Sequence, residues 1–216
     1  MEKEAYIQFL ANKSNQISMN NTNSKLGADC LNLAMPLTTC RWDAPCRKGC
    51  YANKGTQKFA NVQATYYRNL RLYEKDSEDF FDQMYCKIAH SKQSKVRLFD
   101  AGDLPSFEFL DRLVKVCKRI PDVKFMFFTK KYEIVNCYIA LYTLPDNLNI
   151  IFSAWDKNWT VPNPHNLAIA YVDFKDKDMN SDIPKYAFKC PGRESTCSDC
   201  GVCWNKKLKA VVFEQH

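Results

Sequence analysis

Apolar residues recur along the chain in two patterns, and together they predict alternating strands and helices. Short apolar runs, typical of buried strands, cover residues 31–38, 96–99, 123–128, 149–152 and 167–172. Apolar residues at three- and four-residue intervals predict helices over residues 59–73, 78–90, 106–119 and 132–142, with Ser106 as an N-cap. Because strands and helices alternate and the strands are almost continuously apolar, we expect an α/β fold with a mostly parallel sheet.

The number of strand-helix units limits the architecture. About five to six units fit into the chain, which is too few for a closed barrel, so we expect a partial, open β/α barrel of parallel strands. We assign residues 1–25 to an N-terminal arm, 26–185 to the barrel and 186–216 to a C-terminal cysteine-rich, metal-binding segment. The arm is rich in Asn, Ser and Lys, so we expect a loop or a covering arm there.

Composition and the lack of long apolar runs indicate the cellular compartment that we expect for the protein. With 46% hydrophobic residues and 6 glycines the chain has the composition of a globular protein. Its longest apolar runs fall far short of the roughly 20 residues that span a bilayer, and its first residues lack a signal-peptide pattern. We therefore expect a cytoplasmic protein without a membrane partner. In a reducing compartment the 11 cysteines favour metal ligation over disulfides.

The first cysteine group has the spacing C-x5-C-x3-C and consists of Cys40, Cys46 and Cys50. Three thiolates are one short of the four that a closed structural zinc site or a fully ligated [4Fe-4S] cluster uses. One interpretation is a [4Fe-4S] cluster whose fourth iron binds a small ligand. The alternative is an all-cysteine zinc site that is closed by Cys30 or by a cysteine of the C-terminal segment.

The second group has the spacing C-x6-C-x2-C-x2-C and consists of Cys190, Cys197, Cys200 and Cys203. Four cysteines so close together are a strong metal signal in an intracellular chain. The two-residue gaps occur both in ferredoxin-type cluster loops and in zinc knuckles. We favour a second [4Fe-4S] cluster here, with zinc as the alternative.

The other cysteines and the histidines carry weaker signals. We expect simple buried thiols on apolar helix faces at three positions, Cys86, Cys117 and Cys137. The three histidines form no local motif, which argues against a histidine-dependent hydrolase or transferase: His90, His165 and His216.

Polar residues follow each predicted strand, where parallel α/β folds bind their ligands. In chain order they are Thr39 and Cys40, Asp100 and Asp103, Thr129 to Lys131, Ser153 with Trp155 and Asp156, and Asp173. Turns and helix caps also use Asp, Ser and Thr, and this accounts for many of these positions.

These features resemble radical-SAM proteins, and most closely a group of small phage-encoded members. The loop Cys40 to Ala52, with Tyr51 and Ala52 after its last cysteine, is similar to the cysteine loop of that group. The segments RLFDAGDLPSFEFLDRL, FMFFTKKYE and IIFSAWD resemble its strand-end elements, and NSKLG at residues 23–27 resembles its opening. The spacing differs from the C-x3-C-x2-C pattern that is usual in the superfamily.

The resemblance implies a specific chemistry and covers residues 23–205. Cys40, Cys46 and Cys50 would bind a [4Fe-4S] cluster that chelates S-adenosylmethionine and cleaves it reductively to a 5′-deoxyadenosyl radical. The cofactor would be contacted by five residues, Gly102, Asp103, Thr129, Lys130 and Ser153. The substrate is unidentified and is either a macromolecule or held by a partner, and a phage-encoded protein would act in the host cytoplasm.

A net charge of +7 supports a second interpretation. The chain would then be a non-catalytic iron-sulfur or zinc protein that binds nucleic acid or a protein partner. Three tryptophans that we expect to face solvent, Trp42, Trp159 and Trp204, would stack on bases while basic residues contact phosphates.

Overall fold

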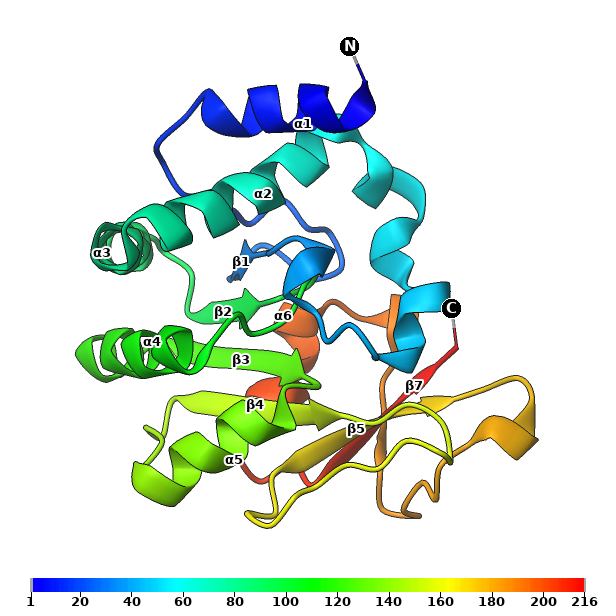
Figure 1. Ribbon diagram of the computed structural model, residues 1–216. Coiled ribbons are helices and arrows are strands. Elements are labelled where there is room, and N and C mark those ends of the chain that lie inside the picture. Colours follow the sequence, from blue (N-terminus) through cyan, green and yellow to red (C-terminus); the bar gives the residue numbers. More distant parts are fainter. Residues whose placement is uncertain (1, 216) are drawn as a thin grey trace.

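The computed structural model describes residues 2–215 and contains one sheet of seven strands. Every pair of neighbouring strands is parallel, in the order β1-β2-β3-β4-β5-β7-β6 (Figure 1). The strand bounds are β1 Cys30–Leu33, β2 Lys95–Leu98, β3 Lys124–Thr129, β4 Leu148–Ser153, β5 Ala168–Asp173, β6 Phe188–Lys189 and β7 Ala210–Glu214.

Six α-helices accompany the sheet in this part of the chain. They are α1 Lys3–Asn12, α2 Ala60–Lys75, α3 Ser77–Ala89, α4 Phe107–Arg119, α5 Tyr132–Leu141 and the short α6 Cys197–Cys200. Ser106 caps α4 as expected, since its hydroxyl accepts a hydrogen bond of 3.0 Å from the backbone amide of Phe109. Short 3₁₀ turns at Leu37–Thr39, Pro45–Gly49, Tyr51–Asn53 and Gly55–Lys58 fill the connection between β1 and α2.

The α/β class and the parallel sheet are confirmed, whereas a barrel is not. Within residues 2–215 the edge strands β1 and β6 do not pair with each other, so the sheet is open. The sheet also has seven strands instead of about five to six, because β6 and β7 lie in the segment that we assigned from the sequence to metal binding. The first predicted strand is too long, since residues after Leu33 leave the strand and enter a 3₁₀ turn.

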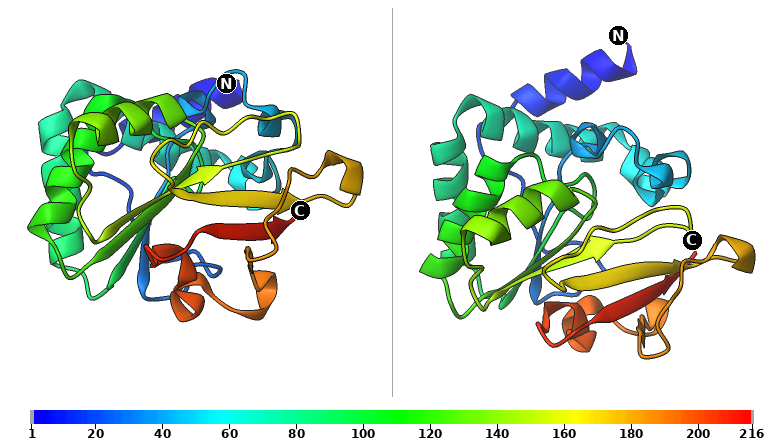
Figure 2. Two further views of the ribbon diagram at one scale, coloured as in Figure 1. Left: turned by 90° about the horizontal axis from the view of Figure 1, so that it is seen from below. Right: turned by 60° about the horizontal axis from the view of Figure 1, so that its bottom comes forward.

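The two faces of the sheet are covered by different parts of the chain. Helices α2 to α5 pack on one face, where apolar strand residues such as Phe125 and Phe127 meet Phe80 and Phe109 of the helices. The C-terminal segment with α6 covers the other face, as Figure 2 shows. Along β2 the burial pattern alternates, so Val96 and Leu98 face the helices while Arg97 faces the C-terminal segment.

The C-terminal segment is anchored at two points. The indole Nε1 of Trp204 donates a buried hydrogen bond of 3.0 Å to the backbone carbonyl of Val96. Backbone amides of Cys197 and Ser198 donate to the carbonyls of Lys25 and Leu26, at 2.9 and 2.8 Å. Residues 23–27, which stood out in the sequence only as an opening motif, therefore hold the cysteine-rich segment in place.

The N-terminal arm covers the molecule as a helix followed by an extended stretch. Helix α1 packs on α2, with Ile7 and Ala11 buried against Ala64. Further along, Asn20 forms an antiparallel bridge with Asn32 and thereby covers the free edge of β1. A covering arm was expected from the sequence, but the helix within it was not.

The turn after β2 brings two backbone segments unusually close together. Phe99 and Gly102 both have positive φ, at 59° and 77°. A Cβ atom on Gly102 would lie 2.5 Å from the backbone oxygen of Met35, in the segment that follows β1. Only glycine fits this position without displacing backbone.

In residues 2–215 no helix is long and apolar enough to span a bilayer.

Replacing Gly102 with alanine should therefore destabilise the protein. The unfavourable φ and the overlap with Met35 together predict a loss of about 2–4 kcal/mol in the free energy of unfolding. Gly49→Ala is the matched control, because a Cβ atom on Gly49 would have no atom within 4 Å beyond its neighbours in the chain. Urea unfolding measures both variants, and equal stabilities would contradict the close approach.

Asn69 on α2 should be equally intolerant of substitution. Its amide nitrogen donates to the carbonyls of Ser18 and Ala34, both at 2.9 Å, and its oxygen accepts from the amide of Ser18 at 2.7 Å. Asn69→Ala leaves buried groups unpaired, which predicts a loss of about 2–4 kcal/mol. Asn61→Ala, on an exposed position of the same helix, should change stability by less than about 0.5 kcal/mol in the same urea assay.

Candidate functional site

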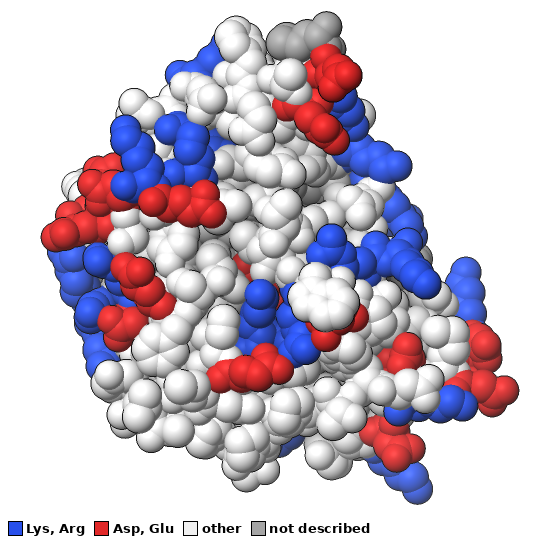
Figure 3. Space-filling view, in the orientation of Figure 1, with Lys and Arg blue, Asp and Glu red and all other residues white. Residues whose placement is uncertain are grey.

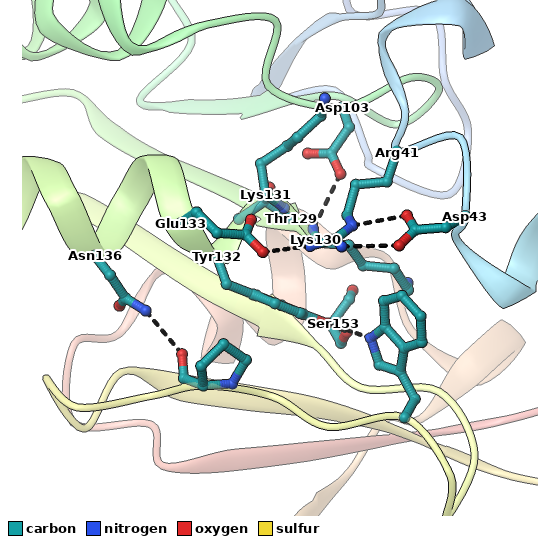
Figure 4. Close-up of polar contacts among 12 residues, drawn as sticks. Arg41, Asp43, Asp103, Thr129, Lys130, Lys131, Tyr132, Glu133, Asn136 and Ser153 are labelled. Carbon is teal, nitrogen blue, oxygen red and sulfur yellow. Dashed lines mark hydrogen bonds and ion pairs between the residues drawn. The ribbon is translucent and has the colours of Figure 1, made fainter.

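One buried residue, Asp103, joins the carboxyl ends of β1, β2 and β3 through its backbone amide and its carboxylate. The backbone amide of Asp103 donates to the hydroxyl of Thr39 at 2.9 Å. Its carboxylate accepts from the amides of Leu104 and Lys130, at 2.7 and 3.0 Å. Burial raises the pKa of Asp103, while hydrogen bonds from the Thr129 side chain and these amides oppose the rise. Asp103 is thus engaged in holding the strand ends together (Figure 4).

The loop after β1 carries Cys40, Cys46 and Cys50, which we call the loop thiols. All three are half-buried, and Cys46 and Cys50 both act on the ionisation of Cys40. Burial raises the pKa of Cys40 to about 12, and Asp103 adds to the rise. The ammonium group of Lys130 acts in the opposite direction on Cys40 and on Cys50. The loop thiols therefore lie together at the carboxyl edge of the sheet, next to a cation.

Charged and aromatic side chains contact one another on one side of this region. Arg41 forms two 2.9 Å hydrogen bonds with Asp43 and a 2.6 Å ion pair with Glu133 at the start of α5 (Figure 4). The guanidinium also lies 5.4 Å from the ring centre of Trp159. The indole of Trp159 in turn donates a 2.8 Å hydrogen bond to the hydroxyl of Tyr132. These contacts fix the start of the cysteine loop against α5.

The residues expected to contact a cofactor lie at neighbouring strand ends. Gly102 follows β2, Thr129 is the last residue of β3 with Lys130 directly after it, and Ser153 ends β4. The hydroxyl of Thr129 accepts a 2.9 Å hydrogen bond from the amide of Lys131, so it is used within its own turn. The ammonium of Lys130 lies 5.8 Å from the ring centre of Trp155. The backbone carbonyl of Ser153 accepts from the hydroxyl of Tyr132.

The second cysteine group, which we call the C-terminal thiols, lies on the opposite face of the sheet from the helices. Its members are half-buried: Cys190, Cys197, Cys200 and Cys203. Burial raises the pKa of Cys203 to about 12; the other three C-terminal thiols raise it further, and Arg97 opposes the rise. The four thiols therefore form a single group with a cation beside it.

Cys30 and Arg97 belong to the surroundings of the C-terminal thiols. From the sequence, Cys30 was one possible fourth ligand beside Cys40, but the thiol that affects its ionisation is Cys197. Arg97 was not singled out. Burial alone would lower the pKa of Arg97, but Tyr51, Cys197 and other neighbours raise it above its ordinary value. A charged residue between apolar neighbours on a short strand was the available signal.

Unpaired polar atoms gather at the same place. Three buried side-chain atoms there have no hydrogen-bond partner in the described chain, namely Asn32 Oδ1, Arg97 Nε and Asp100 Oδ1. Asn32 and Arg97 are paired residues of β1 and β2, and Asn32 donates to the other carboxylate oxygen of Asp100 at 2.8 Å. Within residues 2–215 Arg97 forms no direct ion pair with a carboxylate, although the charge of Asp100 nearby does raise its pKa. Buried charge of this kind is costly unless an anionic group compensates it.

Several expectations for other residues need correction. Of the three thiols expected to be buried, Cys117 is buried, but Cys86 and Cys137 are exposed on their helices. Trp42 is 87% exposed as expected, whereas Trp204 is buried because its indole bonds to β2. Trp159 is half-buried, and His216 lies outside the described residues.

The thiols of each group lie in the same region but are not in the geometry of metal ligands. Across residues 2–215 no group of three or more His, Cys, Asp or Glu side chains is arranged to hold a metal ion. The donor chemistry nevertheless suits a thiophilic metal, since each group offers only sulfur ligands next to a cation. Burial raises the pKa values of Cys40 and Cys203, so metal binding by these two thiols would have to release protons. Metal content thus stays a prediction from the cysteine spacing.

Comparison with known proteins gives one match. Residues 7–206 match the family described as gene product 88, or GP88, and the match is not to a radical-SAM family. No curated protein and no solved structure matches the chain. The matched region includes the loop thiols, the C-terminal thiols and the carboxyl ends of β1 to β5. Since it spans nearly the whole chain, the protein belongs to the gene product 88 family.

Proposed function

We propose that the protein is a radical-SAM-like iron-sulfur enzyme in which Cys40, Cys46 and Cys50 hold a [4Fe-4S] cluster. The observation that carries the proposal is the grouping of these three thiols at the carboxyl edge of a parallel sheet, beside Lys130. Ligands of α/β proteins bind at this edge. Three sulfur ligands would leave one iron free to bind a small molecule.

When bound, such a cluster would supply an electron that cleaves the sulfonium of S-adenosylmethionine to methionine and a 5′-deoxyadenosyl radical. The chain itself would bind and orient. Lys130 offers a positive charge for an anionic group such as a carboxylate, close to Cys40 and Cys50. Gly102 allows the backbone after β2 to approach Met35 closely, and Asp103 keeps that turn in place as a positioning residue.

We further propose that the C-terminal thiols hold a second metal centre. A metal bound by four thiolates has a net negative charge, and Arg97 is a buried cation that has no carboxylate ion pair in the described chain. Asn149 stabilises the same segment, since its side-chain amide donates to the carbonyl of Cys203 at 2.8 Å. We favour a [4Fe-4S] cluster at this site, and zinc is the alternative that metal analysis separates.

Metal analysis of anaerobically purified protein tests both sites. Two clusters predict about eight irons per chain, and zinc at the C-terminal site predicts about four irons with one zinc. Cys40→Ala should remove about four irons in either case. Cys86→Ala is the matched control, because this exposed thiol lies on α3 and belongs to neither group. An unchanged iron content in Cys40→Ala would contradict the proposed cluster.

Catalysis needs a separate measurement. Reduced protein with S-adenosylmethionine should release 5′-deoxyadenosine and methionine, and Cys40→Ala should abolish the release. Adding S-adenosylmethionine to the reduced protein should also change the electron spin resonance spectrum of the cluster. A protein that retains iron but shows neither effect would contradict the enzymatic proposal and favour a non-catalytic iron-sulfur protein.

A further inference from the structure

The stretch that begins in the cysteine loop and continues through most of α2 carries most of the excess positive charge of the chain. Residues 44–73 contain no Asp or Glu and six basic residues, Arg47, Lys48, Lys54, Lys58, Arg68 and Arg71. Setting these six apart from the 31 basic residues leaves 25, against 24 acidic residues in the whole chain. The net charge of +7 therefore comes almost entirely from this stretch.

Four of the six cations are exposed and have no acidic partner in the described chain, although Arg47 also donates a 3.3 Å hydrogen bond to the backbone carbonyl of Arg41. Arg68 and Arg71 bind backbone carbonyls at the end of α1 and just beyond it, so they have a structural role. The other four are exposed, and in the part of the chain that the structure describes none of them forms an ion pair: Arg47, Lys48, Lys54 and Lys58. In Figure 3 blue side chains follow the right-hand edge of the molecule, over the segment drawn in cyan in Figure 1.

Exposed aromatic rings accompany these cations. Trp42 and Phe59 are 87% and 61% exposed; Tyr51 is 48% exposed as a whole residue, and its hydroxyl donates to the carbonyl of Asp100. A single exposed apolar residue needs no explanation, but three large exposed rings on one segment, beside four exposed cations, are typical of an interaction surface. Asp43, the acidic residue next to Trp42, pairs with Arg41, which also pairs with Glu133, so this group of three side chains has a net charge of about −1 and lies beside the cations.

We propose that this surface, consisting of the four exposed cations with Trp42, Tyr51 and Phe59, binds single-stranded nucleic acid. Cations that contact phosphates, combined with rings that stack on unpaired bases, are the chemistry of single-strand recognition. The surface includes Tyr51, the neighbour of Cys50, so a bound strand would pass next to the loop thiols. The inference deepens the proposed function, on which its catalytic part rests, by naming nucleic acid as the substrate class.

Binding of labelled oligo(dT) and oligo(U) of about 16 nucleotides, measured by fluorescence anisotropy over a salt series, tests the inference. Four phosphate contacts predict a slope of about −3 in log K against log salt. The fourfold variant Arg47→Gln, Lys48→Gln, Lys54→Gln and Lys58→Gln should bind at least about tenfold more weakly, with a slope close to zero. The DNA and RNA probes distinguish the two kinds of strand.

The matched control removes four exposed lysines near the amino-terminal edge of the sheet or just before β7, Lys92, Lys118, Lys124 and Lys207. It has the same net charge as the fourfold variant, so it should keep the affinity if position matters. Equal weakening of both variants would overturn the inference, because binding would then follow net charge alone. Equal affinity of the wild type for a duplex of the same length would overturn the assignment to unpaired strands.

A second variant tests binding without changing the cysteine loop, in case the fourfold variant fails to bind iron. Phe59→Ala removes an exposed ring outside the cysteine loop and should weaken single-strand binding about fivefold or more. Leu141→Ala, on a side chain exposed to a similar extent on α5, should have no effect. Iron content is measured on every variant. Failure of binding with iron intact overturns this inference alone, and absence of iron overturns the proposed function while leaving the binding result interpretable.

Discussion

The structure at the proposed site depends on the buried carboxylate of Asp103. Parallel strands bring their carboxyl ends to one edge of the sheet, but the turns that follow have no ladder to hold them. Asp103 replaces the ladder with hydrogen bonds to the turn after β1, to its own turn and to the turn after β3. The position of Lys130 relative to the loop thiols therefore depends on one residue, whose backbone amide binds Thr39 and whose carboxylate binds Lys130.

The division of the sheet into two faces organises the rest of the molecule. One face is covered by helices and is apolar throughout, as in other α/β proteins. The other face includes Cys30, Asn32 and Arg97, and is covered by a cysteine-rich segment with little regular structure. Within residues 190–209 only Trp204 is buried, so this segment has little hydrophobic burial of its own to stabilise it. Its stability relies on the Trp204 anchor, on residues 25–26 and, in our proposal, on a metal.

Strong periodicity made most of the fold predictable. The four long helices behind the sheet and the central strands appear within a few residues of their predicted bounds, because Phe, Leu and Val repeat at helix or strand spacing there. The short strand Phe188–Lys189 has exposed side chains and helix α1 has only two buried residues, so neither has a clear pattern. The prediction for Trp204 was wrong because an indole hydrogen bond to a distant strand leaves no local signal.

The candidate site was predictable to a similar degree. Cysteine spacing identified both thiol groups, since ligands from one loop must be neighbours in the chain. The partners of these groups come from other strands, and a single sequence does not show which strands are adjacent. Arg97 and the placement of Cys30 with Cys197 could therefore emerge only from the sheet order. The sequence shows that residues 44–73 contain no Asp or Glu. Only the structure shows which of the basic side chains in this stretch are exposed and therefore able to bind a partner.

The strand order has a consequence for how the protein is made. Strand β7 lies between β5 and β6, although it follows both in the chain. During synthesis β6 thus leaves the ribosome before its neighbour exists, and β5 presents an open edge until residues 210–214 emerge. The nascent chain would have to carry this unpaired edge while the cysteine-rich segment between β6 and β7 is still being translated.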